Sequence, residues 1–136
     1  MHAILCFASE GVIRDTQTNN ISAFNILEQI SSPGFPLFMQ KMFFFCLLER
    51  EEGDPATVEL RVIASNNDQT IVEVGSTVNF QEKNRNRLII QIGGLAIPSP
   101  GKLVFTLKKD EELLCSYSVE IKKIGEPEVK TVESNT

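Results

Sequence analysis

Strict alternation of apolar and polar residues is the clearest pattern in the chain, and it runs from Leu103 to Ile121. Between residues 103 and 107 the odd-numbered positions hold leucine or phenylalanine, and an acidic turn follows at residues 110–112. From Leu113 onward the odd-numbered positions are again apolar or aromatic. Because successive side chains of a strand point to opposite faces, this pattern predicts a hairpin with one buried and one solvated face.

Shorter segments of strand character fill most of the remaining chain, and glycine, proline, asparagine or aspartate separates them. The clearest of these segments are residues 2–9, 57–65, 70–80 and 87–92. About eight short strands at such spacing are typical of a sandwich or barrel. We therefore expect an all-β protein, a two-sheet antiparallel β-sandwich of immunoglobulin-like or related Greek key topology.

One segment, residues 38–50, is apolar at almost every position from Met42 to Leu48. A strand that is apolar on both sides has to be covered on both sides. The cover on its outer face could be a loop, the segment 21–30 or a second subunit, and the sequence leaves these alternatives open. Segment 21–30 does not alternate cleanly, and its β-branched residues favour a strand, with a helix as the alternative.

Length and composition indicate a single domain, since domains usually run to roughly 100–200 residues. A hydrophobic content of 42% and a charged content of 23% are ordinary for a soluble globular protein. We expect the β-sandwich domain to span residues 1–124. Residues 125–136 are polar and unpatterned, and we expect them to form a flexible tail.

The net charge of −5 argues against a nucleic-acid partner bound through bulk electrostatics, and against an anionic membrane surface. The longest apolar run is far shorter than the ~20 residues that span a bilayer. The apolar stretch 3–8 is too short for the core of a signal peptide. We therefore expect a cytoplasmic protein without membrane contact.

Residues suited to catalysis are few. His2 is the single histidine, so a histidine-activated nucleophile would need the N-terminus to fold back into a pocket. Cys6, Cys46 and Cys115 are widely spaced within apolar strand patterns, and we interpret them as reduced core thiols. The sequence predicts no catalytic residue, no cofactor and no metal ligand set, and we expect the protein not to be an enzyme.

The loop 15–22 is the densest polar cluster and the first candidate binding surface. Its side chains can form turns with their own backbone, but loops on a rigid scaffold are also where binding residues concentrate. The candidate binding residues of this loop are Asp15, Thr18, Asn19, Asn20 and Ser22.

The loop 81–87 is the second candidate, because it carries Lys83, Arg85 and Arg87 against a single glutamate. These cations could hold a phosphate or an acidic partner. The alternative is a solvated connector, since no aromatic residues interleave for base stacking.

Four aspartates that fall in predicted turns define an alternative site. Calcium-binding sandwiches gather loop aspartates because a hard cation needs several oxygen ligands. Aspartate is also common in turns for its own local hydrogen bonds, and no two of these residues are one position apart. The residues are Asp15, Asp54, Asp68 and Asp110.

The order of turn and packing residues carries a resemblance to a known family. Gly34, Phe35 and Pro36 precede the most apolar strand, and Pro100 and Gly101 open the last hairpin. Over residues 3–124 the chain resembles a widespread bacterial family of small uncharacterised proteins. The resemblance implies a bacterial, cytoplasmic or cell-associated sandwich without an assigned activity, and it carries over no catalytic residue. Many members have an aromatic residue after the Pro-Gly turn, where this chain continues with leucine, valine and phenylalanine.

Three functional hypotheses remain. The first is a non-enzymatic module that binds another protein, or itself, through the loop 15–22 or an exposed strand edge. The second is a domain that binds a small ligand or a divalent metal through its loop aspartates. RNA binding through residues 83–87 is the third.

Overall fold

The computed structural model describes residues 1–125, and it folds them into strands without a helix. None of these residues belongs to a helix long and apolar enough to cross a membrane. Of the expected tail 125–136, every residue after Gly125 lies outside the described residues. The strands are β1 (His2–Arg14), β2 (Ile21–Ile26), β3 (Gln29–Ser32), β4 (Leu37–Glu49), β5 (Thr57–Asn66), β6 (Gln69–Asn79), β7 (Arg85–Ile97), β8 (Gly101–Lys109) and β9 (Glu112–Lys123).

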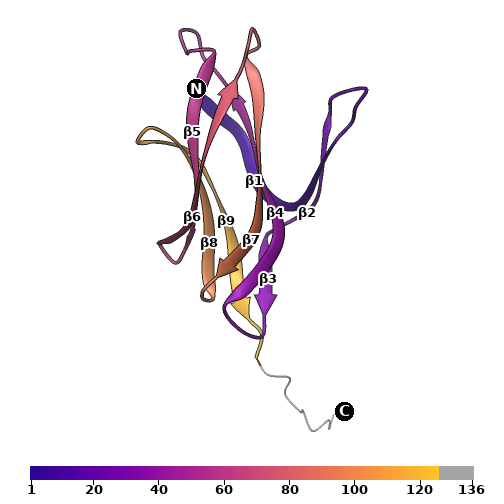
Figure 1. The fold of residues 1–136 in the computed structure, drawn as a ribbon, viewed down its shortest axis with the longest axis vertical. Helices are drawn as coiled ribbons and strands as arrows, with labels where there is room; N and C mark the ends of the chain where they lie inside the picture. The colour runs from indigo at the N-terminus through magenta and orange to yellow at the C-terminus, as the bar shows by residue number, and fades with distance from the viewer. Residues whose placement is uncertain (126–136) are drawn as a thin grey trace.

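Two sheets pack face to face, which confirms the predicted all-β sandwich (Figure 1). One sheet has the order β2-β1-β4-β7, and the other has the order β3-β9-β8-β5-β6. The strands number nine rather than about eight, and the second sheet is mixed, because β3 runs parallel to β9.

The extra strand arises within segment 21–30, where the expected single strand is divided in two. Asn25 has a φ of 54°, in the left-handed region that asparagine tolerates better than most residues. β2 nevertheless continues to Ile26 and pairs with β1 in one sheet, and after Leu27 and Glu28 the chain enters β3, which pairs with β9 in the other sheet. The strand interpretation of this segment was right, but the division between two sheets was not predicted.

The core lies between the two sheets. Phe44 of β4 and Phe105 of β8 are both fully buried, and their rings stack at 5.5 Å across the sandwich. Alternate residues of β5, β7, β8 and β9 complete the interior, as the period-two pattern requires. The largest fully buried side chains are Phe44, Phe80, Phe105, Met42, Leu48, Leu60, Ile97, Leu103, Leu107, Val62, Val119 and Cys46.

The outer face of β4 is apolar, as predicted, and it is partly covered from within the same chain. Phe45 faces away from the core, because its neighbour Phe44 faces into it, and it stacks on Phe7 of β1 at 5.0 Å. Beyond this contact, the tip of the β1–β2 hairpin extends away from β4 and β7, on the side opposite the second sheet (Figure 1). Large apolar side chains of β1, β2 and β7 remain exposed; they include Leu5 at 44%, Ile13 at 57%, Phe24 at 48%, Ile26 at 50% and Ile89 at 38%.

Candidate functional site

The two polar loops singled out by sequence meet at one cleft, which we call the basic cleft. It has a volume of about 510 Å³ and lies between the tip of the β1–β2 hairpin and the outer face of β4 and β7. The segments that meet there are far apart in sequence, so only the fold brings them together. The residues that line the basic cleft are Arg14, Asn19, Leu47, Lys83, Arg85, Asn86, Arg87 and Ile89.

The hairpin tip is held by its own polar side chains. The carboxylate of Asp15 accepts hydrogen bonds from the backbone N–H groups of Gln17 at 2.8 Å and Thr18 at 3.0 Å. These bonds, that from Thr18 with the larger effect, hold the pKa of the Asp15 carboxyl below its ordinary value. The hydroxyl of Thr18 accepts a hydrogen bond from the N–H of Asn20 at 3.2 Å. Asp15 and Thr18 therefore shape the turn rather than face the cleft.

Asn19 connects the hairpin to the sheet. Its φ of 61° places it in the left-handed region, and its carbonyl oxygen accepts a hydrogen bond from the guanidinium of Arg87 on β7. Its side-chain oxygen accepts a second, weaker bond from Arg14 at 3.3 Å. Of the five loop residues predicted from sequence, Asn19 alone lines the cleft.

The sheet provides the cleft with an apolar floor bordered by cations. Leu47 of β4 pairs in register with Leu5 of β1 on one side and with Arg87 of β7 on the other. In the next row, Phe45 pairs with Ile89. Directly opposed residues point to the same face of a sheet, so these side chains form one continuous outer surface.

Positive charge dominates the cleft, although the chain as a whole is acidic. Its lining contains four cationic side chains and no carboxylate, against a net charge of −5 for the protein. Arg85 donates a hydrogen bond to the carboxylate of Glu49, outside the lining, at 2.8 Å. That hydrogen bond, aided by attraction to Arg85 and His2, lowers the pKa of Glu49. All three cations predicted from loop 81–87 lie at this site.

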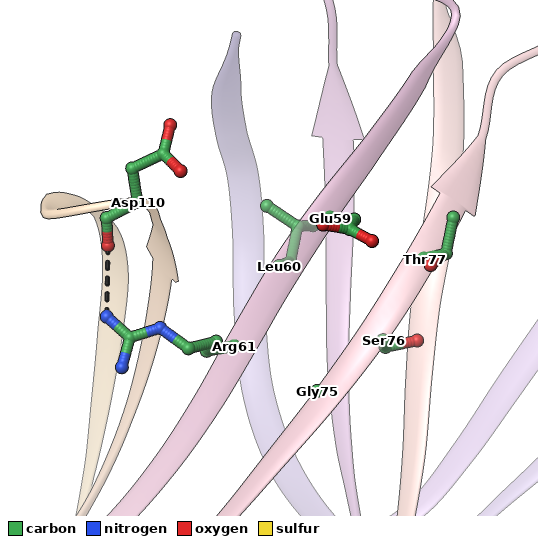
Figure 2. Close-up of a pocket in the computed structure, with 7 residues that line it drawn as sticks. All are labelled: Glu59, Leu60, Arg61, Gly75, Ser76, Thr77 and Asp110. Carbon is green, nitrogen blue, oxygen red and sulfur yellow. Dashed lines mark hydrogen bonds between the residues drawn. The ribbon is translucent and has the colours of Figure 1, made fainter.

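A second depression lies on the five-stranded sheet and differs in character. We call it the Arg61 hollow; its volume is about 500 Å³. Figure 2 shows Arg61 reaching towards the turn after β8, where it donates a hydrogen bond to the carbonyl of Asp110 at 3.0 Å. Glu73 and Glu111 also pair with it, at 3.4 and 3.8 Å. Gly75, its register partner on β6, adds no side chain, which leaves the space open.

The turn aspartates do not assemble into a metal site. Asp15 binds its own turn, and Asp54 accepts a bond from the N–H of Glu51 and pairs with the amino group of Met1, both at 2.7 Å. Within residues 1–125, no group of three histidine, cysteine, aspartate or glutamate side chains is placed to hold a metal ion. The divalent-metal alternative therefore gains no support from the described residues.

Sequence reasoning missed the part of the cleft that comes from strands. Arg14, Leu47 and Ile89 lie in regular strand segments and carry no motif of their own. The available signal was the two-sided apolar character of β4, which implied that its outer face has a neighbour. The identity of that neighbour depends on how β1 bends, and no local sequence pattern predicts the bend.

Comparison with known proteins places the chain in a family without assigning an activity. No curated protein matches the sequence. A family model described as a family of unknown function (DUF6941) matches residues 4–122. The expected resemblance to an uncharacterised family is confirmed to this extent, and its bacterial distribution stays a prediction. Since the match covers almost the whole β-sandwich, the chain belongs to the family of unknown function DUF6941.

Proposed function

We propose that this protein is a non-enzymatic interaction module that binds an acidic segment of a partner protein in the basic cleft. The observation that carries the proposal is a lining of four cations without a carboxylate, on a chain of net charge −5. A positively charged cleft attracts a negatively charged partner. The rest of the surface, which is acidic, repels the same partner.

The apolar floor supports a peptide rather than a simple anion as the occupant. Leu47 and Ile89 lie beside the cations, and Leu5 extends the apolar surface past the cleft, with 44% of its area exposed. An extended acidic peptide that also carries apolar side chains could use both features. Cationic residues would bind its carboxylates, and burial of the apolar contacts would contribute about 25 cal/mol per Å² before ordering costs.

Nucleic acid fits the cleft less well. Single-stranded RNA or DNA binds through cations combined with aromatic platforms on which bases stack. The lining of the cleft contains no aromatic side chain, and the cations there are four in number on an acidic protein. The lining therefore supports an acidic peptide over an extended polyanion.

Selection from a displayed library of random peptides tests the proposal directly. The full chain would be immobilised, and the enriched peptides would be synthesised and measured by fluorescence anisotropy. We expect the enriched peptides to combine glutamate or aspartate with leucine-like residues. The variant Arg85→Glu/Arg87→Glu should weaken their binding by at least about tenfold, equivalent to 1.4 kcal/mol.

Arg61→Glu is the matched control, because it reverses one exposed cation on the other sheet. It should leave peptide affinity unchanged. Enrichment of neutral or basic peptides, or equal loss of affinity in both variants, would contradict the proposal. Complete displacement of the peptide by millimolar inorganic phosphate would instead indicate a small-anion site. A dimeric mass in sedimentation that becomes monomeric with the double variant would identify a second copy of the chain as the partner.

A further inference from the structure

The three cysteines of the chain, far apart in sequence, meet between the two sheets. Cys6 of β1 and Cys46 of β4 are register partners in the four-stranded sheet. Cys115 of β9 comes from the other sheet, and its sulfur lies 3.5 Å from that of Cys46. The thiol of Cys6 also donates to the carbonyl oxygen of Ser116, the neighbour of Cys115, at 3.7 Å. We call this group the thiol cluster; all three of its cysteines are free thiols.

The cluster lies at an open edge of the sandwich. β2 pairs with β1 only from Ser9 onward, so in the described structure Cys6 pairs on one side alone, with β4. β3 pairs with β9 only from Glu120 onward, so Cys115 likewise pairs on one side alone, with β8. Consequently Cys6 and Cys115 are half-buried, whereas Cys46 behind them is fully buried.

The surroundings of the three sulfurs give their thiols different pKa values. Hydrogen bonds from Cys115 and then Cys46 stabilise a thiolate at Cys6 and lower its pKa to about 4, against the opposing effect of burial. Cys115 is hydrogen-bonded to Cys46, which lowers its pKa, but the bond to Cys6 and burial together raise it to about 12. Hydrogen bonding to both neighbours and burial raise the pKa of Cys46. Of the three thiols, Cys6 therefore loses its proton most readily, which ends its donation to the carbonyl of Ser116, and the thiolate is the reactive form of cysteine.

We propose that the thiol cluster is a redox site at which a small hydroperoxide oxidises Cys6 and Cys115 then closes a disulfide with it. The sulfur of Cys6 attacks one peroxide oxygen, and the O–O bond breaks. The leaving hydroxide or alkoxide takes a proton from solvent, and Cys6 becomes a sulfenic acid. The sulfur of Cys115 then attacks the sulfur of Cys6, the S–O bond breaks, and water leaves with the proton of Cys115. The two sulfurs lose two electrons in total, and hydrogen peroxide is reduced to two molecules of water.

A hydroperoxide suits the site because of its size. An oxidant has to approach the half-buried sulfur of Cys6 along the line of the bond that breaks. Hydrogen peroxide is small enough to reach such a sulfur at a sheet edge, whereas a disulfide with bulky substituents is hindered there. The product would join β1 of one sheet to β9 of the other across the open edge of the sandwich. This proposal does not depend on the function proposed for the basic cleft.

Oxidation of the purified, reduced full chain by equimolar hydrogen peroxide tests the site. We expect the intact mass to fall by two hydrogen atoms, and the thiols titrated after denaturation to fall from three to one. Peptide mapping should join Cys6 to Cys115. In Cys115→Ser the reaction should stop at the sulfenic acid of Cys6, which dimedone traps. Cys6→Ser should slow oxidation at least about tenfold, because an ordinary thiol is only a few per cent ionised at neutral pH.

Ser118→Ala serves as the matched control, since it changes an exposed side chain of β9 and leaves all three thiols in place. It should still form the Cys6–Cys115 disulfide, and thermal melting should establish that each variant is folded. Wild-type protein that keeps three thiols after peroxide would overturn the proposal. So would a Cys6→Ser variant that is oxidised as fast as the wild type, because Cys6 would then not be the attacking residue.

Discussion

The outer faces of the two sheets differ in how they use their charges. On the five-stranded sheet, Arg61 is engaged by Glu73, Glu111 and the carbonyl of Asp110, and the surrounding strand alternates polar with buried residues. On the four-stranded sheet, the cleft lining combines four cations with Leu47 and Ile89 and includes no carboxylate. Two depressions of nearly equal volume, about 500 and 510 Å³, therefore differ in charge and in apolar lining.

This difference shows that depressions of similar volume can arise from different arrangements of side chains. The Arg61 hollow exists because Gly75 contributes no side chain opposite an arginine that already has partners. The basic cleft exists because a hairpin stands over an apolar sheet face and is tied to it by Arg87 and Asn19. Unbalanced charge next to exposed apolar surface is what distinguishes an interaction site from a solvated face.

A substitution in the core between the two sheets should have the largest effect on stability, because both sheets pack on that core. Phe44→Ala removes a fully buried ring stacked on Phe105 and should lower the free energy of unfolding by about 3–5 kcal/mol. The matched change Phe43→Ala, on the outer face of the same strand, should cost clearly less, because Phe43 is only half-buried. Urea denaturation measures both. Equal losses would show that the outer face is packed as tightly as the core.

Adding a side chain in the Arg61 hollow should leave peptide binding in the basic cleft unchanged. At Gly75 an added methyl group would meet no atom within 4 Å, and the backbone there needs no positive φ. Gly75→Ala should therefore stabilise the protein by about 0.4–1 kcal/mol through the lower entropy of the unfolded chain. The same urea experiment tests this, and selected cleft peptides should bind the variant as they bind the wild type. A loss of peptide binding would place the binding surface on this sheet instead.

Releasing Arg85 should strengthen the basic cleft. Glu49→Gln removes the carboxylate that pairs with Arg85 at 2.8 Å, and it should raise the affinity for an acidic peptide about two- to threefold, in line with an exposed ion pair. Anisotropy titration measures the change. Glu73→Gln, which frees one contact of Arg61 on the opposite face, is the control and should have no effect on peptide affinity.

The smallest expected effect is a pH dependence at the hairpin tip. The pKa of Asp15 is lowered by backbone hydrogen bonds from Thr18 and Gln17, so its stabilising contribution is complete above the ordinary aspartate pKa of about 3.9. That contribution is lost as the pH falls through the lowered value. NMR titration should show the amide protons of Gln17 and Thr18 shifting at a pH below 3.9, and Asp15→Asn should abolish the shift. A transition at the ordinary value would mean that the turn opens in solution.

Much of the fold was predictable because strand formation is a local matter. The alternation from Leu103 to Ile121 predicted the hairpin of β8 and β9, and both Leu103 and Phe105 are fully buried. Leu113 was wrongly expected to face inward: it is 56% exposed, next to the register shift between Leu107 and Lys108. The pattern failed after Ile26, where Leu27 and Glu28 separate two halves of a single apolar segment that belong to different sheets. Either sheet could bury that segment, so its hydrophobicity does not choose between them.

The candidate sites, like the fold, were predictable only in part. The sequence by itself determined the β-sandwich class, the apolar surplus on both faces of β4, and the cations of loop 81–87. Only the tertiary structure decided that Asn19 lies against Arg87 and that the sulfur of Cys115 lies 3.5 Å from that of Cys46. Alternation specifies which face of a strand is buried, because that depends on neighbouring residues along the chain. It does not specify which strands become neighbours in space, because that depends on how the whole set of strands buries its apolar faces together.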